Sequence, residues 1–246
     1  MPTDYKLIKK QFEKSMNDYD KNATVQDLMA SKLLIELSKI STDFENILEL
    51  GSGTGLLTKR IAKNLHFKLF TANDLIEKSK FYVQKAIPNA NFICGNALKI
   101  KPSKKMDLII SNAMFQWFEN LEKAISIIKL SLKKDSLLAF STFTPENFKE
   151  IKEISGLTLQ YKQKDEILNI LTSQGFEILY CEEFYEEITF KTPLELLAHM
   201  KKTGVNSLST KTWTVKEVKD FCDTFNKKFK ETKLTYSPLL IIAKLK

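Results

Sequence analysis

The sequence predicts an α/β fold built on a doubly wound, mostly parallel sheet of seven strands. Three observations lead to this prediction. Short apolar runs alternate with helical patterns along most of the chain, as in strands joined by helical crossovers. The first run, 46–50, leads directly into a glycine-rich turn and then into a helical pattern. With 246 residues, of which 43% are hydrophobic, the chain is long enough to build the core of such a fold.

The order of the elements follows from the positions of these runs and patterns. Strands are expected where short apolar runs end in polar or glycine residues, at 46–50, 68–73, 91–96, 106–112, 136–143, 178–190 and 239–245. Helices are expected where the helical pattern recurs, at 25–40, 76–86, 121–132 and 165–175. Right-handed crossovers then place a ligand at the carboxyl ends of the parallel strands.

We expect a single domain over residues 1–246. Its parts are an N-terminal helical arm, a ligand-binding core and a C-terminal part, at 1–45, 46–143 and 144–246. The C-terminal part contains an insertion at about 193–230, with two expected helices at 194–202 and 215–230. An insertion of this size in an otherwise compact fold is a candidate lid or recognition element.

The most informative segment is 49–55, Glu-Leu-Gly-Ser-Gly-Thr-Gly, at the end of the first expected strand. Glycine at every second position lets a ligand approach the backbone closely at a helix N-terminus. The spacing differs from the G-x-G-x-x-G of dinucleotide sites, and Glu49 disfavours a phosphate there. A carboxylate in this place suits a nucleotide with a positive amine or sulfonium. A chance glycine-rich turn is the alternative reading.

Asp74 provides a second indication of a nucleoside ligand. It follows the expected strand 68–73 and stands about 20 positions after Gly55, the offset of an acid that binds a ribose. A carboxylate can accept hydrogen bonds from both ribose hydroxyls. Asp74 is also a candidate N-cap for a helix starting near Ile76, and the two roles are compatible.

The charge of the chain limits the classes of partner that it can bind. The net charge is +8, but Arg60 is the only arginine among 38 basic residues. Base readout and bidentate phosphate clamps favour arginine, so we expect no nucleic-acid partner. The lysines are scattered among acidic residues, which is typical of a solvated surface. Such a surface also suits an acidic protein partner.

Cysteine, histidine and hydropathy patterns indicate the compartment. Three dispersed cysteines (Cys94, Cys181, Cys222) predict free thiols. No apolar run approaches the roughly 20 residues of a membrane span, and residues 1–6 lack the apolar region of a signal peptide. We therefore expect a cytoplasmic protein without a membrane partner. His66 and His199 form no ligand cluster, so no metal site is expected.

Residues 49–55 resemble the E/D-x-G-x-G-x-G loop of class I S-adenosylmethionine (SAM) methyltransferases, whose fold is Rossmann-like. Further segments narrow this resemblance to the malonyl-[acyl-carrier protein] O-methyltransferase family of biotin biosynthesis. They are Phe12, Tyr19-Asp20 and 23–26 in the arm, Ser111–Phe118 (Ser-Asn-Ala-Met-Phe-Gln-Trp-Phe), Phe140–Phe143, and His199–Asn206. The Lys-Thr-Gly part of the last segment is the most discriminating.

The resemblance implies an activity, a cofactor and a partner. SAM would donate a methyl group to the free carboxylate of malonyl-[acyl-carrier protein], giving a methyl ester for pimeloyl synthesis. Malonyl-CoA is the alternative acceptor, and the oligomeric state is left open, with a monomer expected. Rival functions are methylation of a free small carboxylic acid, methylation of RNA, and SAM binding without catalysis.

The resemblance also implies the site residues. The expected cofactor-binding residues are Gln26, Glu49, Gly51, Ser52, Gly53, Gly55, Asp74, Leu75, Asn96, Ala97 and Asn112. The expected substrate-binding residues are Tyr19, Gln116, Trp117, Lys201 and Lys202. No general base is expected, because a carboxylate is already ionised at neutral pH. Each substrate residue has a structural alternative: Tyr19 closing the pocket, Trp117 packing, and the two lysines in solvent.

The chain departs from the family pattern at three places. Ser52 stands where the family often has cysteine, a change that we expect to be silent. Asn96 stands where an aspartate commonly meets the adenine amine, and its carbonyl can still accept that bond without charge. The arm has Glu13 and Lys14 where an arginine is frequent, so a carboxylate-binding role of that arginine is not carried over.

Overall fold

The computed structural model describes residues 5–203 and 213–246, and its main sheet confirms the predicted fold. Seven strands run in the order β3-β2-β1-β4-β5-β9-β6. The first five are parallel, and β9 is antiparallel to both of its neighbours. The strands are β1 (Asp43–Leu50), β2 (His66–Asp74), β3 (Asn91–Cys94), β4 (Met106–Ser111), β5 (Leu132–Phe143), β6 (Phe176–Glu183) and β9 (Pro238–Leu245).

Helices cover both faces of this sheet because its central strands carry apolar residues on both sides. In β1, Ile47 packs into one core cluster and Leu48 into another. The first cluster receives residues of α2 (Thr24–Ile40), α3 (Leu56–Asn64) and α4 (Ser79–Ala86). The second receives residues of α5 (Leu121–Lys129) and α7 (Lys164–Ser173). The result is three layers, with the sheet between two helical layers.

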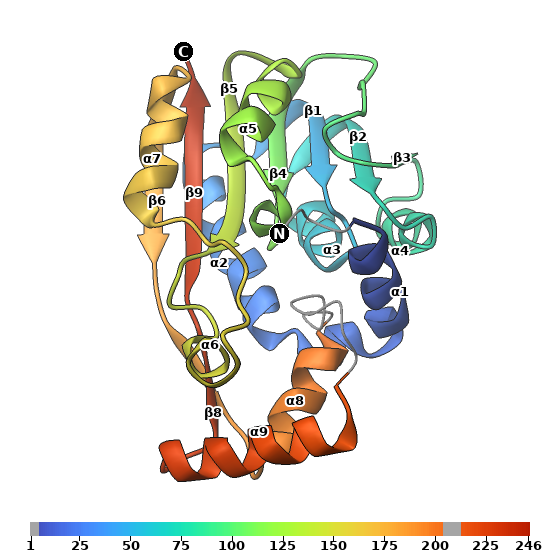
Figure 1. Cartoon of the computed structure of the whole chain (residues 1–246). Coiled ribbons are helices and arrows are strands. Elements are labelled where there is room, and N and C mark those ends of the chain that lie inside the picture. The colour runs from blue at the N-terminus through green and yellow to red at the C-terminus, as the bar shows by residue number, and fades with distance from the viewer. Residues whose placement is uncertain (1–4, 204–212) are drawn as a thin grey trace.

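A third core cluster lies at the carboxyl end of the parallel strands. It joins α6 (Lys149–Ser155), α8 (Pro193–Lys202) and α9 (Val215–Lys228) to a second sheet. That sheet pairs β7 (Glu186–Thr189) with β8 (Lys233–Tyr236) in antiparallel register. Figure 1 shows α8 and α9 below the ends of β1 and β2. The two helices expected at 194–202 and 215–230 are therefore present, at the end of the sheet where a ligand is expected.

The N-terminal arm forms α1 (Tyr5–Asn22), which lies between the carboxyl ends of the strands and α8 (Figure 1). Asp20, near its end, fixes the arm to the glycine turn and to the following helix. One carboxylate oxygen accepts a hydrogen bond from the Thr54 hydroxyl, and the other lies 2.8 Å from the ammonium of Lys59. These contacts hold the arm over the end of β1.

Three predicted elements differ from the structure, and two observed elements, an α-helix and a strand, were not predicted. The expected long strand 178–190 is wrong: the chain breaks after Glu183, and its two halves join different sheets as β6 and β7. The helix expected from Ile76 begins at Ser79, after a turn. The helix expected to reach Leu132 ends at Lys129, because β5 already begins at Leu132. α6 and β8 were not expected. No helix in the described ranges is long and apolar enough to cross a bilayer.

Candidate active site

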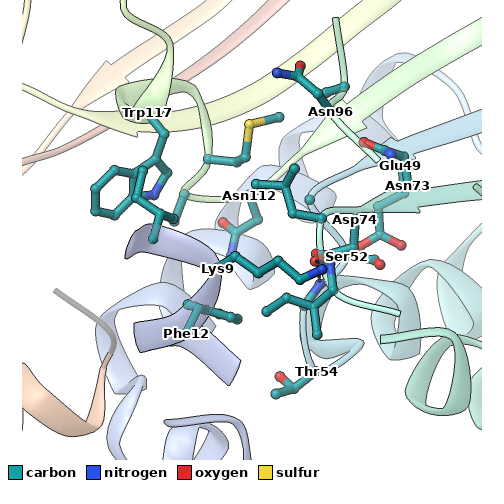
Figure 2. A pocket seen from close by; sticks show the side chains of 18 of the residues that line it. Lys9, Phe12, Glu49, Ser52, Thr54, Asn73, Asp74, Asn96, Asn112 and Trp117 are labelled. Atoms are coloured by element: carbon teal, nitrogen blue, oxygen red, sulfur yellow. Dashed lines mark hydrogen bonds between the residues drawn. The ribbon is translucent and has the colours of Figure 1, made fainter. Parts of the chain in front are cut away.

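A single pocket at the carboxyl ends of β1, β2 and β4 collects most of the predicted site residues (Figure 2). Its open space, mouth included, is about 980 Å³. The residues that line it are Tyr5, Ile8, Lys9, Phe12, Tyr19, Glu49, Gly51, Ser52, Gly53, Thr54, Leu56, Leu57, Asn73, Asp74, Leu75, Ile76, Gly95, Asn96, Ala97, Asn112, Ala113, Met114, Trp117 and Phe118. The pocket therefore combines polar strand ends with a largely apolar cover.

The glycine turn forms the floor of the pocket and is tied to the end of β2. Gly51 and Gly53 have φ angles of 71° and 51°, which favour glycine. The backbone N–H groups of Gly51 and Ser52 both donate to the Asn73 carbonyl, at 2.9 and 3.0 Å. A Cβ on Gly53 would lie 3.3 Å from the Phe12 ring of the arm. Only a residue without a side chain lets the arm approach this closely.

Glu49 is a buried carboxylate beneath this turn, only 1% exposed. Its Oε2 accepts a hydrogen bond of 2.6 Å from the Thr58 hydroxyl of α3. Burial, with a smaller contribution from the negative charge of Asp74, raises the pKa of Glu49 to about 8. A cationic ligand beside such a buried carboxyl group would lower its pKa and so favour its ionised form, with which the cation can pair.

Asp74 shapes the pocket through both of its oxygens. Oδ2 accepts from the Gly53 N–H and Oδ1 from the Ile76 N–H, each at 2.8 Å. Because α4 begins only at Ser79, the second bond closes a turn and is not a helix cap. Burial raises the pKa of Asp74 above its ordinary value. An ionised carboxylate has about four acceptor sites, so a side chain of this kind can also accept from ligand hydroxyls.

The next strand end adds an amide. Asn73 donates to the carbonyls of Ile93 and Gly95, at 2.8 and 2.9 Å, and so fixes the chain after β3. There Asn96 faces the pocket, and its side-chain oxygen accepts from the Leu98 N–H at 2.8 Å. A carbonyl oxygen has two lone pairs, so one remains for a ligand amine. Ala97 and Leu75 line the same part of the pocket.

The arm contributes more to the pocket than the sequence indicated. Tyr5, Ile8, Lys9 and Phe12 all line it from α1, together with Tyr19. Tyr5, Ile8 and Lys9 were not expected there. Their spacing of seven, four and three positions from Phe12 is the signal that would have found them, because such residues share one face of a helix.

Two predicted cofactor residues, Gln26 and Gly55, do not line the pocket. Gln26 is buried in α2, and its backbone carbonyl accepts from the Asn112 side chain at 3.0 Å. Asn112 is also fixed by Ser141, whose hydroxyl donates to it at 2.6 Å. Gly55 precedes α3 with φ of 71° and starts that helix. Their direct contact with a ligand stays a prediction.

The predicted substrate residues divide into two groups. Tyr19 and Trp117 line the pocket, whereas Gln116 does not line it and donates to the Ala113 carbonyl at 2.6 Å. Lys201 and Lys202 are exposed at the end of α8 and do not line this pocket. Gly204 to Asn206, part of the late segment that carries the family resemblance, lie outside the described residues. The substrate roles of these side chains stay predictions.

Two other basic side chains, His199 and Arg60, have partners elsewhere. His199 is buried, and its Nε2 lies 2.8 Å from the Tyr236 hydroxyl. Burial lowers the pKa of His199 to about 4, so the ring is neutral at physiological pH and acts as a structural hydrogen-bond partner. Arg60 pairs with Asp27 of α2 at 2.7 Å and does not line the pocket. Neither residue provides a cation to this site.

The arrangement fits a nucleoside that carries a positively charged amino-acid tail. Two acids, Glu49 and Asp74, lie at neighbouring strand ends, one suited to an amine and one to ribose hydroxyls. Aromatic side chains of α1 and of the turn after β4 cover the space beside them. Within 5–203 and 213–246 no group of three histidine, cysteine, aspartate or glutamate side chains is placed to hold a metal ion.

Comparisons with known proteins agree with this geometry. A family model described as "Methyltransferase domain" matches residues 48–140. A malonyl-[acyl-carrier protein] O-methyltransferase of Haemophilus influenzae is 33% identical over 247 residues, covering 98% of this chain and 95% of that protein. The protein of the same name from Calditerrivibrio nitroreducens is 36% identical over 238 residues, covering 95% and 94%.

Solved structures show the same fold at low identity. A putative methyltransferase from Bacillus halodurans has a TM-score of 0.63 at 17% identity, covering 86% of this chain and 97% of that one. Magnesium protoporphyrin IX methyltransferase from Synechocystis, solved with bound S-adenosylhomocysteine (SAH), has a TM-score of 0.57 at 16% identity, covering 94% and 86%. With relatives above 30% identity over almost their whole length, the chain belongs to the malonyl-[acyl-carrier protein] O-methyltransferase family.

Proposed function

We propose that this protein transfers the methyl group of SAM to the free carboxylate of malonyl-[acyl-carrier protein]. The observation that carries the proposal is the buried Glu49 beneath the glycine turn, beside Asp74 in the same pocket. The full-length relatives bearing this name support it. The product is a methyl ester, which removes the negative charge of the malonyl end.

The pocket residues would each hold a different part of SAM. Glu49, with its Thr58 partner, would receive the α-amino group, and Asp74 would receive the ribose hydroxyls. Asn96 and Ala97, which follow β3, would hold the adenine. When bound, SAM supplies an electrophilic methyl group on a sulfonium. This placement would leave the space beside Tyr19 and Trp117 for the acceptor.

The protein contributes position and exclusion of water to this chemistry. The malonyl carboxylate is ionised at neutral pH, so its oxygen can attack without a general base. In-line alignment with the methyl–sulfur bond converts a bimolecular encounter into an oriented reaction. The rings of Phe12 and Tyr19, 4.8 Å apart on the arm, cover this space and exclude water from the nucleophile.

The proposed test offers several acceptors to the purified protein with SAM. Malonyl-[acyl-carrier protein], malonyl-CoA, free tricarboxylic acids and RNA are incubated separately, and mass spectrometry detects a methyl ester or methylated base. We expect the malonyl thioester on the carrier protein to become an ester. Methylation of the free acids or of RNA, without ester on the malonyl thioesters, would contradict the proposal.

The preference for a carrier protein predicts a dependence on salt. The chain carries a net charge of +8, and exposed lysines lie on α1 beside the pocket mouth. An acidic carrier protein is attracted to such a surface, and salt screens the attraction. We expect the KM for malonyl-[acyl-carrier protein] to rise about ten-fold between 0.05 and 0.3 M salt. Malonyl-pantetheine, which lacks the carrier, is the control, and equal salt profiles for both thioesters would contradict the prediction.

A further inference from the structure

The pocket holds one positive side chain whose role is not explained so far. Among the described lining residues, Glu49 and Asp74 are acidic and Lys9 is the one cation. Lys9 lies on the exposed side of α1, and its side chain runs across the pocket toward the side that carries Ser52 and Asp74 (Figure 2). It has no ion-pair partner in the part of the chain that the structure describes.

Ser52 gives an independent indication at the same place. Its hydroxyl is buried and has no hydrogen-bond partner among the described residues, although Ser52 lines the pocket. Buried hydroxyl groups normally have a hydrogen-bond partner, so the unpaired Ser52 hydroxyl points to a ligand that accepts a hydrogen bond from it. The first turn of α3 begins nearby at Leu56, which also lines the pocket, and adds positive potential from its free N–H groups.

We propose that Lys9 and Ser52 form a carboxylate-binding subsite at the α3 side of the pocket. A cation, a hydroxyl donor and a helix N-terminus together suit a carboxylate. This inference rests on the proposed function, which brings two carboxylates to the pocket: the α-carboxylate of the cofactor and the malonyl carboxylate. The α-carboxylate of the cofactor is bonded to the same carbon atom as the α-amino group that we assign to Glu49. Glu49 stands three positions before Ser52 in the sequence.

The sequence predicted Ser52 only as one of the cofactor-binding residues, and the subsite makes its role specific. A cysteine in its place has a much weaker donor than a hydroxyl. In our proposal, serine in place of cysteine at position 52 is therefore not without effect, although the sequence led us to expect none. The Ser52 hydroxyl donates a hydrogen bond to the carboxylate whose charge Lys9 neutralises. Lys10, the next residue on α1, is exposed and does not line the pocket, so it provides a matched control.

Calorimetry with two ligands tests the subsite. SAH carries the carboxylate, and its decarboxylated analogue keeps the nucleoside, thioether and amine but lacks it. We expect Lys9→Ala to weaken SAH binding about ten-fold and Ser52→Ala several-fold, with little effect on the analogue. Lys9→Arg restores most of the affinity, and Lys10→Ala behaves as wild type.

A kinetic arm distinguishes the source of the carboxylate. If SAH binding is unchanged while Lys9→Ala raises the KM for the malonyl thioester about ten-fold at an unchanged kcat, the subsite holds the acceptor and the proposal stands. If Lys9→Ala changes neither the preference for SAH over its decarboxylated analogue nor the KM for the malonyl thioester, the subsite does not exist. Failure of the proposed function is separate, because the wild-type protein would then form no ester on the malonyl thioester, while calorimetry would still measure its affinities for SAH and for the analogue.

Discussion

Replacement of Asp74 by alanine is expected to abolish SAM binding while leaving a folded protein. The side chain accepts from the Gly53 and Ile76 N–H groups, and in our proposal it also accepts from the ribose hydroxyls. Asp74→Ala leaves both N–H groups without this partner and removes the ribose acceptor. Each lost charge-assisted bond costs about 1.5–3 kcal/mol, so affinity should fall at least 100-fold.

Calorimetry with SAH measures this loss, and circular dichroism checks the fold. Asp43→Ala is the matched control, because Asp43 begins β1 at the opposite end of the strand from the pocket. An analogue of SAH without the 2′-hydroxyl separates the two tasks: wild type should bind it more weakly than SAH, and Asp74→Ala should no longer distinguish them. Unchanged SAH affinity in Asp74→Ala would show that the ribose lies elsewhere.

The second large effect concerns Glu49, where function and stability should change in opposite directions. Burial raises the pKa of Glu49 to about 8, from an ordinary value of 4.5. The folded protein therefore retains a proton that the unfolded chain releases, and stability is lost as the pH rises through about 8. Glu49→Gln keeps an acceptor for the Thr58 hydroxyl and cannot ionise.

We expect Glu49→Gln to weaken SAM binding about 100-fold, because the α-amino group loses a buried anionic partner worth ~3 kcal/mol. Without ligand, the same variant should melt at a higher temperature than wild type at pH 9, and at the same temperature at pH 4.5. Thermal denaturation at both pH values and calorimetry with SAM measure the two effects. A variant that binds SAM like wild type would place the amine elsewhere.

The parts of the fold that the sequence predicted are those set by local patterns. The glycine turn, Glu49 and Asp74 stand at strand ends that apolar runs define, so their convergence follows from parallel topology alone. The division of 178–190 into two strands could not be predicted in this way. Residues on both sides of the break have similar strand character, and the partners that separate them, β9 and β8, come from far along the chain.

The site was predicted less completely on the side of the arm. Lys9 and Ile8 enter the pocket because α1 packs across the strand ends, and that placement depends on tertiary contacts such as the Asp20 bonds to Thr54 and Lys59. Gln26 does not line the pocket, and the contact it makes toward it is between its backbone carbonyl and the side chain of Asn112. The identity of a side chain in the sequence does not reveal that the backbone of the same residue makes the contact.

The central claim is that the acidic glycine turn binds a nucleoside with a positively charged amino-acid tail. Calorimetric titration of the wild-type protein with SAM, SAH and a nicotinamide dinucleotide tests it most directly. We predict one site per chain for SAM and SAH, and no heat with the dinucleotide. Binding of the dinucleotide, with no heat from SAM or SAH, would contradict the account.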